Sequence, residues 1–214
     1  MIKIENVEIF GWEAAIRGMR NPKNSWDKSD SRYKLYYAKD NESPSEYYDV
    51  MIGPNDLKLM TTLANAGTDH GKFLRMITVF ADVNAPLYWW KEADTYRMGV
   101  EKNSCSTMHK IHAKEFTMDD FSYEHNIYYG NLGHTIDALN HAREQYLLTK
   151  DKKYWYSMIQ TLPCSYNQKR TCMISYAALR NMYNARRFHK LDEWRDFCDW
   201  IKTLPYSELI TGED

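Results

Sequence analysis

Residues 67–109 read GTDHGKFLRMITVFADVNAPLYWWKEADTYRMGVEKNSCSTMH, and the fold is predicted most directly from them. Within this run, residues 74–83 (LRMITVFADV) are rich in β-branched and aromatic side chains and lie between Gly71 and Pro86, which is typical of a largely buried strand. Pro86 then favours the start of a helix that runs to Tyr96, because proline suits the first turn of a helix. The run therefore predicts a strand followed at once by a helix.

The residues on the N-terminal side add a strand and two helices. Residues 2–10 alternate loosely, as in a strand, and residues 12–20 carry apolar side chains at helical spacing. A second helix is predicted from Pro54 to a stop at Gly67. The polar stretch 21–45 fits either a long functional loop or a pair of strands, and both interpretations stay open.

The C-terminal half is predicted to consist mainly of helices. Apolar side chains recur at helical spacing in residues 131–149, 152–162, 172–188 and 191–203. The last of these has one continuous apolar stripe, made by Leu191, Trp194, Phe197, Cys198 and Ile201. Together with the strands, these helices predict a mixed α/β (α+β) protein with a mixed sheet packed by helices and a helix-rich C-terminal half.

Length and charge restrict the class of protein. A chain of 214 residues can bury a core of its own, so residues 1–214 are expected to form a single domain. The net charge is −1, with 28 basic and 29 acidic residues, which does not provide the positive field that holds a nucleic acid polymer. No apolar run has the length of a signal peptide or a membrane span, so we expect a cytoplasmic protein that does not enter a membrane.

Cysteine and histidine spacing indicates neither a disulfide framework nor a metal site. The four cysteines, Cys105, Cys164, Cys172 and Cys198, contain no C-x-x-C pair, and reduced thiols are the plain interpretation. Four histidines have spacings that could suggest a metal site, but none belongs to an H-E-x-x-H pattern. They are His109, His112, His134 and His141. We therefore expect no metal ion.

The same run of residues resembles the centre of the flavin-dependent thymidylate synthases. In that family a turn with a histidine precedes a strand, an Ala-Pro step leads into a helix with a glutamine, and R-H-R and N-E-x-S-x-R-Y follow. Here His70 lies in the turn, Ala85-Pro86 forms the step, and Glu92 stands in the glutamine position. Thr95-Tyr96-Arg97 replaces R-H-R, and residues 103–109 (NSCSTMH) keep the Asn and the Ser of the last pattern.

The C-terminal third carries further parts of the resemblance in the same order. Leu162-Pro163 comes first, Ala178-Leu179-Arg180 then resembles the family's N-L-R, and Glu193-Trp194-Arg195 resembles its E-I-R. The resemblance implies a mixed α/β fold that assembles as a homotetramer, with active sites made between subunits. It also implies an enzyme in which FAD, reduced by NADPH, carries the hydride, and methylene-tetrahydrofolate supplies a one-carbon unit to dUMP, so that the protein mainly binds and orients.

The resemblance assigns a role to each candidate site residue. It implies that Arg180 anchors a phosphate and that Arg195 activates the base as the catalytic residue, while salt bridges with nearby aspartates are the alternative for both arginines. The substrate-binding set is Glu92, Ser104, Ser106, Arg180 and Arg195. The cofactor-binding set is His70, Tyr96, Arg97 and Asn103.

The replaced motif residues leave other functions open. Met108 stands where the family has a phosphate-binding arginine, which motivates a changed reaction such as hydroxymethylation, or another pyrimidine nucleotide as the substrate. A nucleotide-binding or structural oligomer without flavin chemistry is the alternative from a different class of protein. Spectroscopy of a purified sample separates an enzyme from such a scaffold, because bound flavin absorbs visible light.

Overall fold

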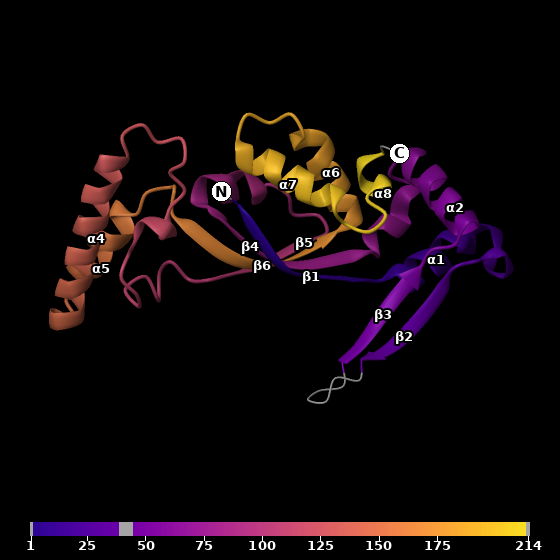
Figure 1. Cartoon of the computed structure of the whole chain (residues 1–214), viewed down its shortest axis with the longest axis horizontal. Helices are drawn as coiled ribbons and strands as arrows, with labels where there is room; N and C mark the ends of the chain where they lie inside the picture. Colours follow the sequence, from indigo (N-terminus) through magenta and orange to yellow (C-terminus); the bar gives the residue numbers. More distant parts are fainter. Residues whose placement is uncertain (1, 39–44, 213–214) are drawn as a thin grey trace.

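Four antiparallel strands form the central sheet, in the order β1-β4-β6-β5 (Figure 1). They are β1 (Lys3–Phe10), β4 (Thr78–Pro86), β6 (Asn167–Ser175) and β5 (Val100–Ser104). The computed structural model describes residues 2–38 and 45–212 of the chain. The expected mixed α/β class is confirmed, but the sheet is antiparallel in each pairing rather than mixed, because neighbouring strands run in opposite directions throughout.

The side chains of strand β4 point alternately to a covered face and to an open face of the sheet. Val79, Ala81 and Val83 are buried on one face, whereas Phe80 and Asp82 point to the other. This alternation follows from the two-residue period of a strand. The register of β1 against β4 shifts between Glu5 and Glu8, a bulge that bends the edge strand.

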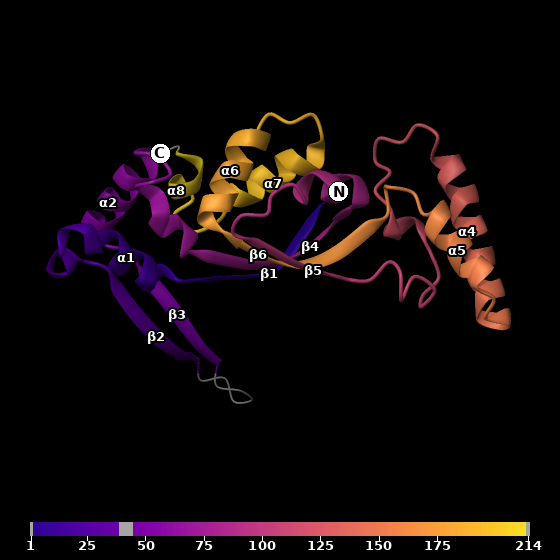
Figure 2. The ribbon, with the colours of Figure 1, turned by 180° about the vertical axis from the view of Figure 1, so that it is seen from behind.

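Helices lie on the covered face of the sheet. They are α3 (Leu87–Ala93), α6 (Tyr176–Arg186) and α7 (Asp192–Lys202), with the short α8 (Glu208–Thr211) beside α6 (Figure 1, Figure 2). Trp90, Trp194 and Tyr176 are among the largest side chains buried between these helices and the sheet. The main core of the molecule therefore lies on this face.

The N-terminal part adds two helices and a separate two-stranded sheet. Helix α1 (Trp12–Arg20) and helix α2 (Pro54–Asn65) flank the 3-10 turns η1 (Asn21–Lys23) and η2 (Trp26–Lys28) and the antiparallel pair β2 (Arg32–Ala38) and β3 (Ser45–Met51). The pair projects from the body (Figure 1). Of the two interpretations of residues 21–45, the strand pair is the one observed in the described part.

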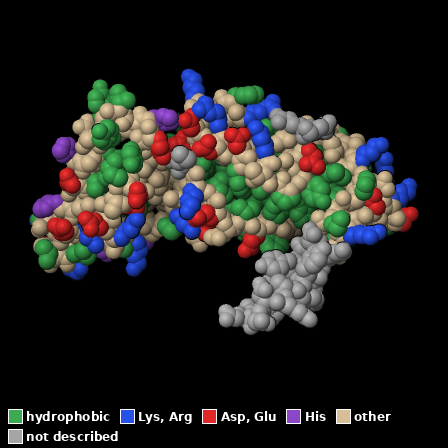
Figure 3. Space-filling view, viewed as in Figure 1, with side chains coloured by type: hydrophobic (Ala, Val, Ile, Leu, Met, Phe, Trp, Pro, Cys, Tyr) green, Lys and Arg blue, Asp and Glu red, His purple; other side chains and the backbone are tan. Residues whose placement is uncertain are grey.

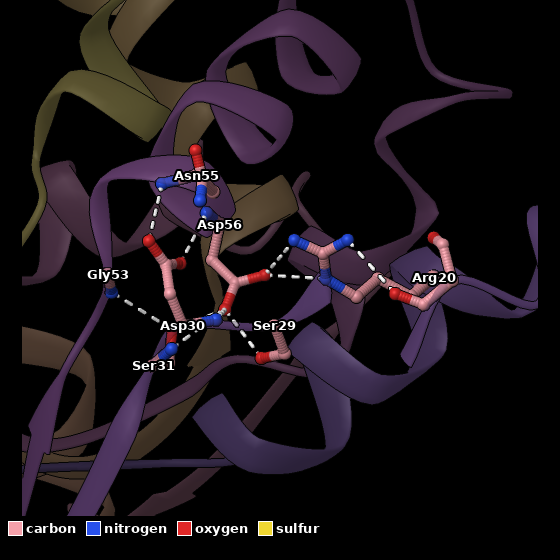
Figure 4. A network of polar contacts seen from close by, with 8 residues as sticks. Arg20, Ser29, Asp30, Ser31, Gly53, Asn55 and Asp56 are labelled. Carbon is pink, nitrogen blue, oxygen red and sulfur yellow. Dashed lines mark hydrogen bonds and ion pairs between the residues drawn. The ribbon is translucent and has the colours of Figure 1, made fainter. Parts of the chain in front are cut away.

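A buried polar network fixes the base of the projecting strand pair (Figure 4). Asp56 is fully buried and accepts hydrogen bonds from Arg20 Nε at 2.7 Å, Ser29 Oγ at 2.6 Å and Ser31 Oγ at 2.6 Å. Burial alone would raise the pKa of Asp56, but these bonds outweigh it and hold the pKa below its ordinary value. Gly53 leaves room for the capping carboxylate of Asp30, because a Cβ there would approach that carboxylate to 2.3 Å.

Two long helices form a lobe with a core of its own at the far end of the molecule (Figure 1). They are α4 (Tyr129–Thr149) and α5 (Lys152–Thr161), and the turn η4 (Met118–Asp120) precedes them. Its apolar cluster is separate from the main one and consists of Ile111, Phe116, Phe121, Leu132, Ile136, Leu139, Ala142 and Met158. Within the described ranges, no helix is long and apolar enough to cross a membrane.

The open face of the sheet is partly apolar. Figure 3 shows hydrophobic side chains gathered across the middle of the molecule. The exposed apolar side chains on β1 and on or just before β4 are Val7, Phe10, Met76 and Phe80. Beside them, a cavity of about 390 Å³ lies between the start of α1 and the strand pair and is lined by Phe10, Trp12, Tyr33 and Val50 among others.

Several predicted elements differ from the observed ones, among them the helix predicted to run from Pro86 to Tyr96, which ends at Ala93. The predicted strand 74–83 begins only at Thr78, because the turn η3 (Gly71–Arg75) precedes it. The predicted helix 172–188 is the end of β6 followed by α6, whose start is fixed by Ser175 Oγ accepting from Ala178 N. Residues 103–104, for which no strand was predicted, belong to β5, because they pair with β6.

Candidate functional site

Three of the segments that resemble family motifs meet at Arg186, between α3, α6 and α7. Glu92 on α3 accepts a hydrogen bond from Trp194 Nε1 on α7 at 3.0 Å. The same carboxylate oxygen pairs with Arg186 Nη1 at the end of α6, at 2.8 Å. Arg186 Nε in turn donates to the Tyr96 hydroxyl at 2.9 Å. The guanidinium of Arg186 therefore connects α3, which carries the glutamine position, with the segment that replaces R-H-R and with α7.

Aromatic rings flank this guanidinium, and solvent reaches one side of it. The Arg186 carbon Cζ lies 5.0 Å from the ring centre of Trp194 and 5.6 Å from that of Tyr96, within the range of cation–π attraction. The side chain of Arg186 is 22% exposed and that of Glu92 is 36% exposed. A ligand can reach both without a change of backbone, so these residues form a surface rather than a sealed core.

His189 completes what we term the Glu92–Arg186 cluster, which consists of Glu92, Tyr96, Arg186, His189 and Trp194. His189 Nε2 lies 3.4 Å from the Glu92 carboxylate, and His189 Nδ1 accepts from the backbone N–H of Leu191 at 3.2 Å. Because Nδ1 is an acceptor, the ring hydrogen of the neutral form is placed on Nε2 and faces Glu92. The cluster thus combines a carboxylate, a guanidinium, an imidazole and two aromatic rings.

Arg195 lies on the exposed side of α7, next to this cluster in the chain. Its guanidinium forms an ion pair with Asp192 one turn earlier, and Asp192 also contacts His125 Nε2 at 2.8 Å. The salt-bridge alternative is therefore the contact that Arg195 makes within this chain. Its side chain is still 52% exposed, and surface pairs of this kind contribute little energy, so an anionic ligand can compete for it.

A tyrosine and a glutamate join α3 to the first turn of α7. The hydroxyl of Tyr88 donates to the carboxylate of Glu193, which is 7% exposed. Burial, followed by the hydrogen bond and the negative charge of Glu193, raises the pKa of Tyr88. The contact fixes the start of the helix that carries Trp194 and Arg195.

The segment with the predicted substrate-binding hydroxyls begins at the end of β5 and continues past it. Asn103 and Ser104 lie on β5, opposite Thr171 and Arg170. Ser106 Oγ accepts from the backbone N–H of Met108 at 3.2 Å and of His109 at 2.9 Å, which closes the following turn. This turn lines a cavity of about 370 Å³ at the edge of the sheet, together with Lys3, Glu5, Asn84, Cys105, Thr107, Lys114, Asp119, Asp120, Tyr166, Asn167, Gln168 and Lys169.

The charges around this cavity are largely paired with one another. Lys3 lies 2.6 Å from Glu5, Lys169 lies 2.9 Å from Asp82, and Lys114 pairs with Asp120. Hydrogen bonds to Asp82, led by the one from Thr171, lower the pKa of that carboxyl to about 2. Because three lysines face an equal number of carboxylates, the cavity has no strong preference for an anion.

Arg180 and the turn with His70 lie at the other end of α6. Arg180 Nη1 donates to the carbonyl of Leu209 at 2.9 Å and Nη2 donates to Asn65 Oδ1 at 3.0 Å. A recess of about 180 Å³ lies between Arg180 and residues 67–71, the turn in which His70 is exposed. Arg97 is exposed in the turn between α3 and β5, where its carbonyl accepts from Val100 N at 3.4 Å.

Seven of the nine predicted site residues fall into three groups in a single chain, and Arg97 and Arg195 are exposed outside these groups. Glu92 and Tyr96 share Arg186, Arg180 adjoins the turn that contains His70, and Asn103, Ser104 and Ser106 follow one another at β5. The recess at Arg180 and the cavity at Ser106 have no lining residue in common. The described residues contain no group of three or more side chains suited to hold a metal ion.

The sequence interpretation did not include Arg186. Asn184-Ala185-Arg186 keeps both the Asn and the Arg of N-L-R, whereas Ala178-Leu179-Arg180 keeps only the Leu and the Arg. This signal was visible in the chain itself. The structure supports it, because Arg186 and not Arg180 contacts the residues that replace the other motifs.

Comparison with known proteins identifies the fold. No family model matches this sequence, and no curated protein matches it. Thymidylate synthase X (ThyX) from Helicobacter pylori, solved with FAD and dUMP, is similar to this chain with a TM-score of 0.72 and 15% identity, over 99% of this chain and 98% of that one. A second structure of flavin-dependent ThyX from Helicobacter pylori, complexed with FAD and dUMP, has a TM-score of 0.69 and 16% identity, over 97% and 99% of the two chains.

The UMP/dUMP methylase PolB from Streptomyces cacaoi, bound with 5-Br dUMP, is also similar, with a TM-score of 0.62 and 16% identity over 99% of this chain and 95% of that one. These similarities extend over nearly the whole length of this chain and of each chain compared with it. They therefore include the α4–α5 lobe and the projecting strand pair as well as the sheet. The resemblance inferred from the motifs is thereby confirmed for the fold. The chain has the fold of the flavin-dependent thymidylate synthases.

Proposed function

We propose that this protein is a flavin-dependent enzyme that transfers a one-carbon unit from methylene-tetrahydrofolate to a pyrimidine nucleotide such as dUMP, with NADPH as the reductant. The observation that carries the proposal is the meeting of three motif-like segments, those of Glu92, Tyr96 and Trp194, at the guanidinium of Arg186. The shared fold supports it, because the similar ThyX structures hold FAD and dUMP.

The chemistry of this surface fits FAD. A flavin nucleotide presents a diphosphate, which a guanidinium can bind bidentately, and a flat ring system, which packs on aromatic side chains. Arg186 would provide the first kind of contact and the half-buried ring of Tyr96 the second, whereas Trp194 is fully buried and packs against Arg186 from the inner side. Arg97, Asn103 and His70 complete the proposed cofactor-binding set. When bound, FAD would carry the hydride.

The nucleotide is assigned to the hydroxyls at the end of β5 and just after it and to exposed guanidinium groups. Ser104 and Ser106 would form hydrogen bonds to the nucleotide, while Arg195 would leave Asp192 and polarise a carbonyl of the base. Arg180 is the second proposed substrate-binding arginine. Glu92 is assigned a positioning role, since its carboxylate already accepts from Trp194 and Arg186.

Assembly with other copies of the chain is part of the proposal. The three groups of site residues lie apart in one chain, and the sheet has one uncovered face with exposed apolar residues such as Phe10 and Phe80. Sheets usually bury their apolar face against another layer, and a projecting two-stranded sheet has little stability alone. A homotetramer would cover these surfaces and bring the groups together from different subunits.

The experiment begins with the visible absorbance of the purified protein and a titration with FAD. Replacement of Arg186 by Met removes charge-assisted contacts of about 1.5–3 kcal/mol each, so we expect FAD to bind at least tenfold more weakly. Arg17→Met on α1 is the matched control, because Arg17 is an exposed arginine distant in sequence from every motif, and it should leave the affinity unchanged. A protein that shows no flavin bands and no saturable FAD binding would contradict the proposal.

Product analysis separates the possible substrates. The protein is incubated with methylene-tetrahydrofolate, FAD and NADPH, together with either dUMP or UMP. The likeness to the UMP/dUMP methylase PolB is the reason to include UMP as the second nucleotide. Formation of dTMP supports thymidylate synthesis, and a methylated or hydroxymethylated product from either nucleotide supports a changed reaction. Binding of nucleotide without any product would favour the non-catalytic oligomer.

A further inference from the structure

The recess beside Arg180 has the features of an anion site. It lies where the end of α2, the turn of residues 67–71, η3 and the first turns of α6 meet (Figure 1, Figure 2). Its polar lining comes from Asn65, Thr68, Arg75 and Arg180. The remaining lining residues are small or apolar: Ala64, Gly67, Gly71, Leu74 and Ala177.

The charges that line the recess are all positive. Arg75 and Arg180 contribute two guanidinium groups, and among residues 2–38 and 45–212 the lining contains no aspartate or glutamate. This separates the recess from the cavity at Ser106, where lysines and carboxylates balance. Arg75 is exposed and makes no ion pair with any residue in the described ranges 2–38 and 45–212. Two like charges beside one small space favour a bound anion.

The recess is held in shape before any ligand arrives. Arg180 is oriented by the Leu209 carbonyl and by Asn65, which fixes its guanidinium fork. The facing turn is closed by backbone bonds from His70 N and Gly71 N to the Gly67 carbonyl, at 3.2 and 2.9 Å. Gly67 adopts φ +103°, a conformation that other residues rarely accept. Preorganised donors lose little entropy when they bind.

The volume limits what can enter. At about 180 Å³ the recess is smaller than the roughly 300–1,000 Å³ of sites that enclose a whole small molecule. A tetrahedral oxyanion or the end of a longer ligand fits this size. Burial lowers the pKa of Arg180, and a bound anion would offset that cost of holding the charge away from water.

We propose that the Arg75–Arg180 recess binds a phosphate group, with Arg75 and Thr68 as ligands in addition to Arg180. The phosphate can come from inorganic phosphate or from the phosphomonoester of a nucleotide, whose base and sugar would lie outside the recess. The oxyanion chemistry follows from the recess itself. Only the nucleotide as the source rests on the proposed function.

Calorimetric titration of the full chain with inorganic phosphate, dUMP and deoxyuridine tests the proposal. Arg75→Met is the main variant, because Arg75 is exposed and its loss should not affect folding. We expect it to weaken the binding of the phosphate-bearing probe about tenfold or more. Lys72→Met is the matched control, since Lys72 is an exposed cation of the same turn η3 that does not line the recess. Arg180→Lys, which retains a positive charge, is the second variant.

The outcomes are distinct. Saturable binding of phosphate that depends on Arg75 but not on Lys72 supports a site for the free anion. Binding of dUMP with the same dependence, without binding of deoxyuridine, supports a nucleotide phosphate. Equal affinities in the wild type and Arg75→Met, or equal losses in Arg75→Met and Lys72→Met, would overturn the proposal. Failure of FAD to bind bears on the proposed function alone, because these titrations need no flavin.

Discussion

Replacing Asp56 by Asn should destabilise the protein strongly. The carboxylate is fully buried and faces Arg20, whose Nη2 lies 2.6 Å away and whose side chain is only 5% exposed. The amide removes the negative charge and leaves the guanidinium buried without a counter-charge. Breaking a buried pair in this way costs about 3–5 kcal/mol, a large part of the roughly 5–15 kcal/mol that stabilises a domain. For a chain of this size, the loss corresponds to a fall in Tm of roughly 6–20 °C.

Thermal unfolding followed by circular dichroism measures this effect. Asp27→Asn is the control, because Asp27 is an exposed carboxylate in η2 of the same segment and should change stability by no more than about 0.5 kcal/mol. Folding lowers the pKa of Asp56, so its contribution to stability is present above the ordinary aspartate pKa of 3.8 and is lost as the pH falls through the lower pKa of the folded state. The variant should lack this part of the acid dependence. A Tm within about 2 °C of wild type at neutral pH would refute the role of the buried pair.

Two further predictions concern the core. Burial raises the pKa of Cys172 and of Cys198 to about 11. A thiol reagent at neutral pH should therefore modify only the exposed Cys105 and Cys164 until the protein is unfolded. Rapid reaction of four thiols in the native protein would contradict this prediction. Tyr88→Phe leaves the buried carboxylate of Glu193 without its hydrogen-bond donor and should lower the free energy of unfolding, measured by urea denaturation, by about 1–3 kcal/mol. An unchanged denaturation midpoint would show that this contact does not stabilise the start of α7.

Much of the fold could be predicted from local patterns, because several elements have strong periodicity. The helix Trp12–Arg20 was predicted with its observed bounds, and the last long helix differs by one residue at each end. Strand β6 was missed because Lys169 and Thr171 make it look polar. The structure explains their presence, since both side chains bind Asp82 on the open face of the sheet. Pairing of this kind depends on residues distant in the chain, and no local window contains it.

The candidate site was predicted in its parts but not in its arrangement. The motif segments named Glu92 and Tyr96, and the structure brings both to Arg186. Both residues were predicted to bind ligands, whereas within the chain both side chains contact Arg186, which is 90 positions from Tyr96 in the sequence. Sequence patterns indicate which residue types are present in each segment. They do not show which guanidinium of α6 faces α3, a choice that depends on helix orientation against the sheet.

The α4–α5 lobe has an apolar cluster that is separate from the main core of the protein. Loss of packing around Leu139 or Met158 therefore does not remove contacts beneath α3, α6 and α7. Regions with independent cores open with independent free energies, and hydrogen exchange detects such openings separately. Changes in lobe length or composition can thus accumulate in related chains while the surface that carries Arg186 keeps its geometry.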